Sequence, residues 1–506
     1  MFKKRLKNIA SKNQARVIGM CIAFIFCFCN NLFSQHEKHF GTNAIVRDFN
    51  YIEKIIDAHP DPYTHFSEQN FKAKFEEIRS TLDHPHTTLE YYKKVASIVA
   101  LIKDGHSSVH LPKFWMQTQR AKKGAFPYEV YLTNEDELYV IKKFNNGEIP
   151  LAAKIISING ISVDDFLVRI DPYISYELKH FRNTVIDEDF EKYLYLAFGY
   201  ADGTEITYFT SDTSSVKVKN MPYQEWKKFQ KENKDEREIK IEFKEPYAYK
   251  QVADGVGLIS IYEFYAKDLV TYDQFLTKTF KKIKKDSINS LIIDIRGNFG
   301  GWPKISSRLF HYISNSYFKT MARSSMKVSA TYRNNFLNRN DYLRYYKGQL
   351  NFATQRHYVD MNGLMNNPLG SYVHEDQFFN EEPVIEEFEF KGDVYLLINR
   401  DSYSAASSFA STFQCYQMGT IIGEETGGTK IFRANAIYEK LPRTGIGISM
   451  ATTKNYTTCY DQELEGVKPT MYFTPTIFGL TSNLDTQLLF TLNVIKLKQK
   501  KQISAN

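Results

Sequence analysis

Three short segments combine serine, histidine or glycine with a turn beside an expected strand or helix. The first, residues 294–302 (DIRGNFGGW), places Gly297, Gly300 and Gly301 directly after the apolar run LIIDI and before Pro303. Glycine lets the backbone turn sharply and present bare N–H groups, and a helix that begins at Pro303 would add positive potential. These features suit an oxyanion hole, although a plain strand-to-helix turn would use the same residues.

The second segment, residues 402–408 (SYSAASS), joins the apolar run VYLLI to a helical pattern. A serine at such a junction lies near a helix N-terminus, which also stabilises the negative charge that develops on a substrate oxygen. The segment therefore suits a nucleophile. Serine is also a preferred N-cap residue, so the segment could serve only to begin the helix.

The third segment is Asp-Gly-His-Ser at residues 104–107. A serine nucleophile needs a neighbouring base to take its proton, and histidine is the usual base at neutral pH. Of the twelve histidines, His106 is the one in a glycine-containing turn at an expected domain boundary. A single histidine is more often a surface or core residue, so this segment gains weight only together with the other two.

The elements that must position these segments follow from the hydrophobic pattern. Residues 42–103 repeat apolar positions every three or four residues, which predicts a helical N-terminal region. Residues 126–167 change to strand-like runs with a tight turn at Asn159-Gly160. From about residue 255, apolar strand-like runs alternate with helical patterns, which predicts an α/β domain with a largely parallel sheet. Catalytic groups in such a sheet belong at the carboxyl ends of its strands.

Taken in order, the segments resemble the tail-specific (C-terminal processing) and tricorn-core family of serine peptidases. LIIDIRGNFGG is similar to the family's D-x-R-x-N-x-G-G strand and turn, and VYLLINRDSYSAASSFASTFQCYQMGTIIGEETGG is similar to its nucleophile segment. DGHSSVHLP, AAKIISINGISVDDFL, and LPRTGIGISM with ELEGVKPT resemble further family segments. The resemblance implies an α/β fold with a layered ββα (ClpP/crotonase-like) peptidase core, a helical N-terminal domain and a PDZ-like β module.

The resemblance also assigns roles to single residues. The nucleophile falls on Ser404, the second serine of S-Y-S-A. Ala405 would then donate one backbone N–H to the oxyanion, and Gly300 or its neighbour Gly301 would donate the other. The implied chemistry requires no metal and no cofactor.

The base is where the sequence departs from part of the family. Tail-processing members use a lysine, but Thr429 occupies that position here and Lys430 is displaced by one residue. Tricorn-core members use a histidine, so His106 is the favoured base and Lys430 the alternative. Glu465, in LEGVKPT, is the expected acid that orients the base. Its competitors lie on the turn GEETGG: Glu424 and Glu425.

The N-terminus predicts export. Six Lys or Arg precede the apolar run 17–29, and the polar stretch NNLFSQ follows it, which is the order of a secretory signal peptide cleaved near Gln35. A retained membrane anchor is the alternative.

The formal net charge of +7 falls to about +1 without the six signal cations, which removes the support for nucleic-acid binding. Cys415 and Cys459 remain after cleavage, and either a bridge or two free thiols fits the sequence.

The sequence therefore predicts an exported, periplasmic or extracellular serine endopeptidase that acts on a peptide or protein and has no stable membrane insertion after signal cleavage. A catalytically inactive peptide- or ligand-binding protein on the same fold is the alternative. An α/β-hydrolase esterase is disfavoured because no G-x-S-x-G motif is present. Thr470 and Ser407 differ from the family's usual residues and weaken the expectation of a protein-tail substrate.

The expected domains are a signal peptide (1–35), a helical N-terminal domain (36–112), a PDZ-like module with a connector (113–245), a peptidase core (246–485) and a C-terminal tail (486–506).

Overall fold

The computed structural model describes most of the 506-residue chain after its N-terminal segment. The described residues are 39–144, 147–199, 203–242, 245–314, 316–338, 363–379, 388–461, 464–482 and 484–505. The expected signal peptide, residues 1–35, lies outside them. Within the described ranges, no helix is long and apolar enough to cross a membrane.

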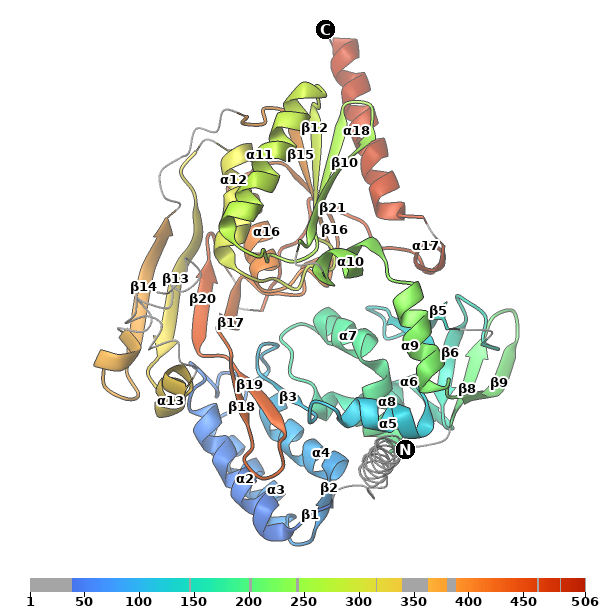
Figure 1. Cartoon of the computed structure of the whole chain (residues 1–506), viewed down its shortest axis with the longest axis vertical. Coiled ribbons are helices and arrows are strands. Elements are labelled where there is room, and N and C mark those ends of the chain that lie inside the picture. The colour runs from blue at the N-terminus through green and yellow to red at the C-terminus, as the bar shows by residue number, and fades with distance from the viewer. Residues whose placement is uncertain are drawn as a thin grey trace, which may run out of the picture.

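A six-stranded sheet forms the centre of the C-terminal half of the chain (Figure 1). Its strand order is β10-β11-β12-β15-β16-β21, and every neighbouring pair is parallel except β10 with β11. The inner strands are buried along almost their whole length, so both faces of the sheet need a cover. The predicted parallel α/β domain is confirmed. Its strands are β10 (Tyr247–Ala253), β11 (Val256–Ile261), β12 (Ser290–Asp294), β15 (Asp393–Ile398), β16 (Thr420–Gly423) and β21 (Met471–Tyr472).

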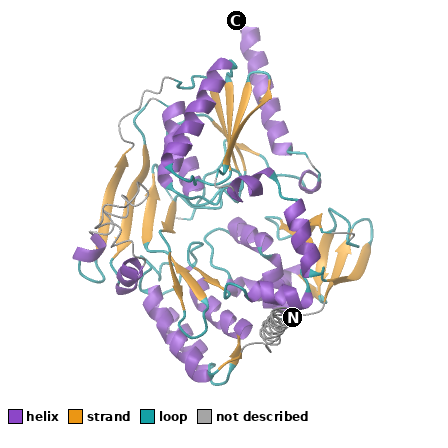
Figure 2. Ribbon diagram, viewed as in Figure 1, coloured by secondary structure: helices purple, strands orange, loops and turns teal. Residues whose placement is uncertain are grey.

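Helices cover both faces of this sheet, as Figure 2 shows. One face packs against α11 (Leu269–Lys285), α12 (Pro303–Ile313) and α16 (Ala405–Cys415) in a shared apolar cluster. The other face packs against α18 (Thr486–Ala505) through Ile495 and its neighbours. The segment expected to be a C-terminal tail is therefore a helix that completes the core, because the second face of the sheet would otherwise expose buried strand residues to water.

Two smaller sheets extend the core toward the N-terminal region. The first has the antiparallel order β14-β13-β20-β17, and the second has the order β18-β19-β3. In the second, Ile448 of β19 pairs with Val109 of β3, directly after the Asp-Gly-His-Ser turn. These strands are β3 (Ser108–His110), β13 (Lys319–Lys327), β14 (Tyr372–Phe379), β17 (Ile431–Ala434), β18 (Ile437–Lys440), β19 (Gly447–Met450) and β20 (Thr453–Thr457). Helix α13 (Ala330–Asn338) lies between β13 and β14 in the chain, and α17 (Ile477–Thr481) lies between β21 and α18.

The N-terminal region is helical, as the periodicity predicts. Helix α2 (Thr42–Ile56) buries Ile45, Phe49 and Ile52, which recur at three- and four-residue spacing on one face. Helix α4 (Thr88–Val99) begins with a capping box between Thr87 and Glu90. The remaining elements are β1 (His39–Phe40), α3 (Glu68–Ser80), β2 (His86–Thr87) and the short 3₁₀ helix η1 (Ala100–Ile102).

Between the helical region and the core lies an antiparallel sheet of order β4-β5-β6-β8-β9, to which β7 is added beside β6. The predicted turn at Asn159-Gly160 joins β6 to β7, and both residues have positive φ, 47° and 78°. We call this sheet with its helices the β module, residues 125–221. Its elements are β4 (Tyr128–Leu132), β5 (Leu138–Lys143), β6 (Lys154–Ile158), β7 (Ile161–Ser162), α6 (Val163–Ile170), η2 (Asp171–Tyr173), α7 (Lys179–Glu188), α8 (Phe190–Phe198), β8 (Gly203–Phe209) and β9 (Thr213–Lys219). Flanking helices are α5 (Trp115–Lys123), α9 (Tyr223–Glu232) and α10 (Glu236–Glu242).

The two cysteines that follow the expected signal peptide form a bridge. Cys415 at the end of α16 and Cys459 just after β20 have Cα atoms 5.8 Å apart and are disulfide-bonded. Of the two alternatives that the sequence leaves open, the structure therefore contains the disulfide.

Candidate active site

Ser404 lies at the carboxyl end of β15, immediately before helix α16. Its φ and ψ are 55° and −117°, a conformation that non-glycine residues rarely adopt and that costs of order 1–3 kcal/mol. The serine is the N-cap of α16, yet its side chain makes no capping hydrogen bond. The strained turn therefore directs the hydroxyl away from the helix that it begins, which is the opposite of the plain capping role.

Ser402, the other serine of the S-Y-S-A motif, is fully buried. Its hydroxyl donates to the carbonyl of Ile295 at 2.9 Å and accepts the N–H of Asn399. These bonds hold the loop after β15 against the loop after β12. Ser402 is thus a structural residue of the turn, and Ser404 is the serine with a hydroxyl available for chemistry.

The glycine turn after β12 packs directly against Ser404. A Cβ on Gly300, whose φ is 108°, would lie 2.8 Å from the Ser404 Cβ and 2.9 Å from the amide nitrogen of Ala405. A Cβ on Gly301, whose φ is 134°, would lie 2.2 Å from the carbonyl oxygen of Phe264. Both positions therefore require glycine because of their φ and because of the close approach.

The amides of this turn are not equivalent. The N–H of Gly300 donates to the Oδ1 atom of Asn298 at 2.8 Å, so it is already used within the turn. The amides of Gly301 and Ala405 have no acceptor among the described residues. Of the two glycines expected as oxyanion donors, Gly301 is therefore the one with an unused N–H group.

His106 lies opposite Ser404 and uses both ring nitrogens. Its Nε2 atom is 3.0 Å from the Ser404 Oγ atom, across 298 residues of sequence. Its Nδ1 atom is 2.9 Å from the hydroxyl of Tyr403. The structure thus brings together the serine and histidine that the sequence singled out.

A stack of aromatic rings holds the histidine in place. The His106 ring lies 4.7 Å from the Tyr403 ring and 6.1 Å from the Phe432 ring, with interplanar angles of 29° in both pairs. On the other side of Tyr403, the ring of Phe181 from α7 stacks at 4.0 Å and 5°. Elements from the core and the β module therefore fix the orientation of the imidazole.

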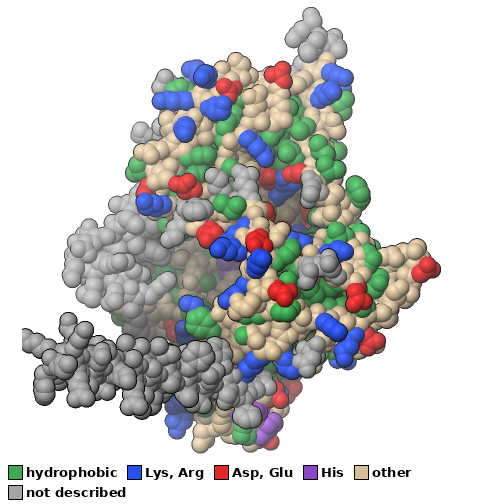
Figure 3. All heavy atoms as spheres, turned by 45° about the vertical axis from the view of Figure 1, so that its right-hand side comes forward, with side chains coloured by type: hydrophobic (Ala, Val, Ile, Leu, Met, Phe, Trp, Pro, Cys, Tyr) green, Lys and Arg blue, Asp and Glu red, His purple; other side chains and the backbone are tan. Residues whose placement is uncertain are grey.

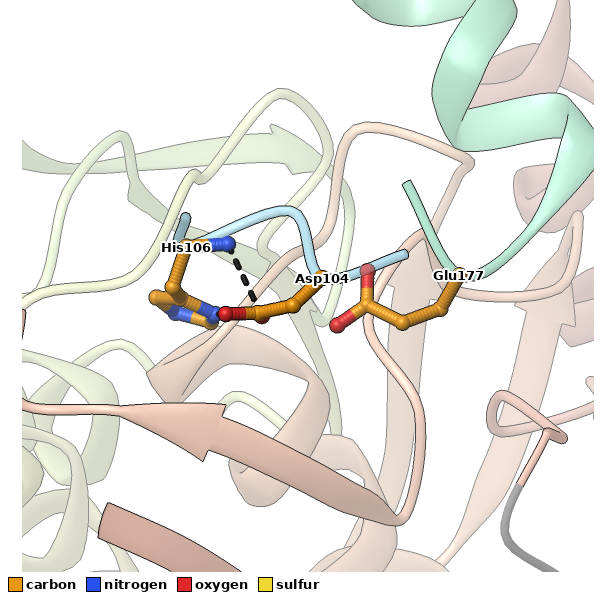
Figure 4. Close-up of side chains that lie close together, drawn as sticks. All are labelled: Asp104, His106 and Glu177. Atoms are coloured by element: carbon orange, nitrogen blue, oxygen red, sulfur yellow. Dashed lines mark hydrogen bonds and ion pairs between the residues drawn. The ribbon is translucent and has the colours of Figure 1, made fainter. Parts of the chain in front are cut away.

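Asp104 is a buried, ionised acid beside the histidine (Figure 4). Its Oδ1 atom accepts the backbone N–H of His106 at 3.0 Å and lies 3.7 Å from the ring Nδ1. Its Oδ2 atom lies 3.3 Å from the Nε2 atom of His59 and accepts the Ser107 hydroxyl. Burial alone would raise the pKa of Asp104, but the hydrogen bonds and charges of His106 and His59 hold it well below its usual range.

Glu177, just before α7, completes this cluster from the side of the β module (Figure 4). Its Oε2 atom accepts the N–H of Gly105 at 3.0 Å, and its buried Oε1 atom has no partner among the described residues. Burial and the negative charge of Asp104 raise the pKa of Glu177 to about 8. Glu177 therefore holds a proton at neutral pH. Burial, with the charges of Glu177 and Asp104, also raises the pKa of Tyr403 well above its usual range.

Asp104, His106 and Glu177 offer metal-ligand atoms within 4.8 Å of one another. However, both ring nitrogens of His106 already face hydroxyl groups, those of Ser404 and Tyr403. The cluster is therefore arranged to hold an imidazole between a serine and a tyrosine.

The expected orienting acid, Glu465, does not contact His106. Its carboxylate pairs with the Lys468 amine and lies 3.5 Å from the Lys430 amine. The Lys430 amine itself donates to Asp461 at 2.9 Å. Both carboxylate oxygens of Glu465 therefore lie beside lysine amines. The amine of Lys430, the alternative base, lies between two acids, Asp461 and Glu465.

The two competing acids also serve elsewhere. Glu425 accepts the N–H of Gly466 at 2.7 Å, and Glu424 faces a cavity between the β module and the core. Asp104 takes the place next to the histidine. Asp104 and Tyr403 adjoin the predicted base and nucleophile in sequence, which is a signal that could have found them. Glu177 has no such signal, because only the fold brings it to His106.

Comparisons with known proteins agree with this geometry. Residues 255–473 match the family model described as "Peptidase family S41". Among solved structures, mature CPAF is similar with a TM-score of 0.56 and 14% identity, covering 87% of this chain and 94% of that chain. Mature CPAF complexed with lactacystin is similar with a TM-score of 0.58 and 15% identity, covering 89% of this chain and 99% of that chain. At these identities, the likeness to CPAF shows a shared fold. No curated protein matches the chain in sequence.

The family match spans the central sheet, the glycine turn and the Ser404 turn. The structural likeness extends over the N-terminal helices and the β module as well, because it covers most of both chains. Residues 255–473 therefore belong to peptidase family S41, the tail-specific family, and the chain is a serine-type peptidase.

Proposed function

We propose that the chain is an exported serine endopeptidase in which Ser404 attacks a peptide carbonyl and His106 acts as the general base. The observation that carries this proposal is the 3.0 Å contact between the Ser404 hydroxyl and the His106 Nε2 atom. A base within hydrogen-bond reach of a hydroxyl can take its proton as the bond to the carbonyl carbon forms. The strained conformation of Ser404 supports the assignment, since the surrounding structure maintains it at a cost.

The hydrogen bonds around the imidazole define the path of the proton. For Nε2 to accept the Ser404 proton, the Nδ1 atom must carry the other ring proton, and it then donates to the Tyr403 hydroxyl. The positive charge that forms on the ring lies 3.7 Å from the carboxylate of Asp104. Because Asp104 is buried and ionised, its negative charge stabilises the imidazolium more than it would in water.

Backbone amides stabilise the oxyanion in this mechanism. The N–H of Ala405, at the N-terminus of α16, is one donor, and the N–H of Gly301 is the other. The helix N-terminus adds positive potential at the same point. Loss of one such donor typically lowers turnover roughly 100- to 1000-fold. The tetrahedral intermediate then expels the amine, which takes its proton from His106, and water hydrolyses the acyl-enzyme with His106 again as base.

The remaining parts of the chain have supporting roles in this proposal. The N-terminal segment is a cleaved signal peptide, and the mature enzyme acts in the periplasm or outside the cell on a peptide or protein. The core is a ClpP/crotonase-like layered domain, which the parallel sheet and its helices support. The β module is PDZ-like, and its antiparallel sheet can take up an extended peptide as an added strand.

Active-site labelling tests the proposal. A fluorophosphonate probe that reacts with activated serines should label the wild-type protein at one site. Ser404→Ala should abolish the labelling, while the circular dichroism spectrum remains unchanged. Ser402→Ala, in the same turn, is the matched control and should still be labelled, because the Ser402 hydroxyl is buried. Labelling that persists in Ser404→Ala refutes the assignment, and a wild-type protein that is never labelled favours the non-catalytic binding protein.

A further inference from the structure

A cavity of about 670 Å³ separates the β module from the core, outside the catalytic cluster. It lies on the face that Figure 3 brings forward, where acidic and basic side chains surround the hollow between the β module and the core. Residues of β4, β5, α7, α9 and α10 line one side, and the loops after β15 and β16 line the other. Nine of the lining residues are Asp or Glu and three are Lys or Arg. The lining therefore carries an excess of negative charge.

All three cations of the lining are already paired with acids of the same lining. Arg120 pairs with Glu191 at 2.7 Å, and Lys142 with Glu129 at 3.2 Å. The third pair is Arg400 with Asp187, in which Arg400 also stacks on the Tyr131 ring. The acids of the lining therefore outnumber its cations, although one of the remaining acids, Asp189, pairs at 2.6 Å with Lys192, which lies outside the lining.

Glu424 is the one of these acids that points to a ligand. It follows β16 directly, is 6% exposed and lines both this cavity and an adjoining one of about 370 Å³. Its Oε1 atom is buried and has no hydrogen-bond partner in the described part of the chain. A buried carboxyl oxygen without a partner costs about 1–3 kcal/mol, so its retention calls for an explanation.

The charges around Glu424 keep it near its point of ionisation. Burial raises its pKa to about 7, and the charges of Asp401 and Glu135 act in the same direction, whereas Arg400 opposes them. A cation that enters the cavity would therefore meet a carboxyl group that ionises readily at neutral pH.

We infer that this cavity binds the ammonium or guanidinium group of a peptide's Lys or Arg side chain, with the Glu424 carboxylate as its partner. Six aromatic residues line the cavity, which suits the alkyl stem and the charge of such a side chain. They are Phe126, Tyr128, Tyr131, Phe144, Phe190 and Trp226. A metal ion fits less well, because Glu424 belongs to no group of three metal-ligand side chains among the described residues.

The position of Glu424 connects this site to the catalytic turn. Four residues after it, Gly428 lies against Ser404, since a Cβ on Gly428 would be 2.9 Å from the Ser404 amide nitrogen. A peptide anchored at Glu424 is thus held by the same loop that supports the nucleophile. The role of that peptide as a substrate rests on the proposed peptidase function, whereas its binding does not.

Binding of blocked pentapeptides to the full chain carrying Ser404→Ala tests the inference, because no cleavage can interfere. The peptides differ only at the central residue, which is lysine, arginine or the uncharged norleucine. Calorimetry should give at least 10-fold tighter binding for the lysine and arginine peptides than for the norleucine peptide. Adding Glu424→Gln should reduce this preference to within twofold and leave the norleucine affinity unchanged.

The matched control is Glu129→Gln, which removes an acid of the same lining that already has a partner, Lys142. It should preserve the preference for lysine. Equal binding of the lysine and norleucine peptides, no binding of either at millimolar concentration, or a preference that survives Glu424→Gln would each overturn the inference. So would Glu424-dependent binding of Mg²⁺ or Ca²⁺ without any preference for lysine. Loss of labelling in the active-site experiment would leave these binding results unchanged.

Discussion

Asp104 shows how a single buried carboxylate can serve two histidines. The backbone N–H of Asp61 donates to the Nδ1 atom of His59, so the Nε2 atom of His59 carries the proton that faces Asp104. His59 therefore donates a hydrogen bond to Asp104, which helps to keep the carboxylate ionised. The carboxylate can then stabilise a positive charge on His106, 3.7 Å away.

At the same scale, the structure places Glu465, the expected orienting acid, beside two lysines and not beside His106. A sequence places an acid near a motif but does not say which cation will pair with it. Lys430 and Lys468 lie on either side of Glu465 and take its oxygens. Asp104, only two residues from the histidine, accepts its backbone N–H, and Gly105 between them leaves room for the Tyr403 hydroxyl. A Cβ on Gly105 would come within 2.5 Å of the Tyr403 hydroxyl.

Glu177 gives a testable dependence of stability on pH. Its pKa is raised to about 8 in the folded protein, so folding takes up a proton between the usual carboxyl pKa and that value. The free energy of unfolding should therefore fall as pH rises from 5 to 8, by at most about 1.4 kcal/mol per pH unit from this group. Glu177→Gln cannot ionise, so the variant should gain stability relative to wild type over this range. Urea unfolding at several pH values measures the difference.

The matched control for Glu177 is Glu76→Gln, an exposed acid of α3 that pairs with Arg79. Its stability difference from wild type should stay constant from pH 5 to pH 9, because this side chain lies on the surface in contact with water. A Glu177→Gln difference that is equally constant from pH 5 to pH 9 would show that Glu177 is ionised in the folded protein. The ionised Glu177 would then be a second negative charge near His106, in addition to Asp104.

At the scale of elements, the disulfide ties the helix of the nucleophile to a neighbouring sheet. Cys415 ends α16 and Cys459 follows β20, 44 positions later in the sequence. A cross-link of this length stabilises mainly by restricting the unfolded chain, typically by about 2–4 kcal/mol. Reductant should therefore lower the Tm of the wild-type protein, as measured by calorimetry. The Cys415→Ser, Cys459→Ser double variant should show the lower Tm with and without reductant. A Tm that reductant does not change would contradict the bridge.

The sequence predicts some elements better than others, and the reasons are physical. Helix α2 and the strands β11, β12 and β15 follow from apolar periodicity, because one face or both faces of each element are buried. Helix α18 was expected to be a tail. Its apolar residues face a sheet formed by strands far away in sequence, so its role depends on packing that no local pattern reveals.

At the scale of the whole molecule, the site is assembled from three parts of the chain. The N-terminal region supplies Asp104 and His106, the core supplies Ser404 and Tyr403, and the β module supplies Glu177. Motifs predict the serine and the histidine because each lies in a short segment that resembles a segment of the peptidase family. They cannot predict Glu177, since its contact with Gly105 spans 72 residues and exists only in the packed molecule.

This assembly makes the β module part of the catalytic arrangement. Phe181 of α7 stacks on Tyr403 at 4.0 Å, and Tyr403 in turn contacts the Nδ1 atom of His106. Phe181→Leu keeps an apolar side chain in this buried place but removes the stack, so the imidazole should lose its fixed orientation. We expect kcat to fall about 10-fold with KM unchanged within twofold, since positioning of a catalytic group acts on the chemical step.

Phe198→Leu, which disturbs the stacked pair Phe166–Phe198 elsewhere in the β module, is the matched control. It should lower stability to a similar degree and leave kcat unchanged. If both variants lose activity in parallel with their Tm, then the β module acts only through overall stability. If Phe181→Leu alone lowers kcat, then the module reaches the base through Tyr403, and any peptide that shifts α7 would change the rate of the enzyme.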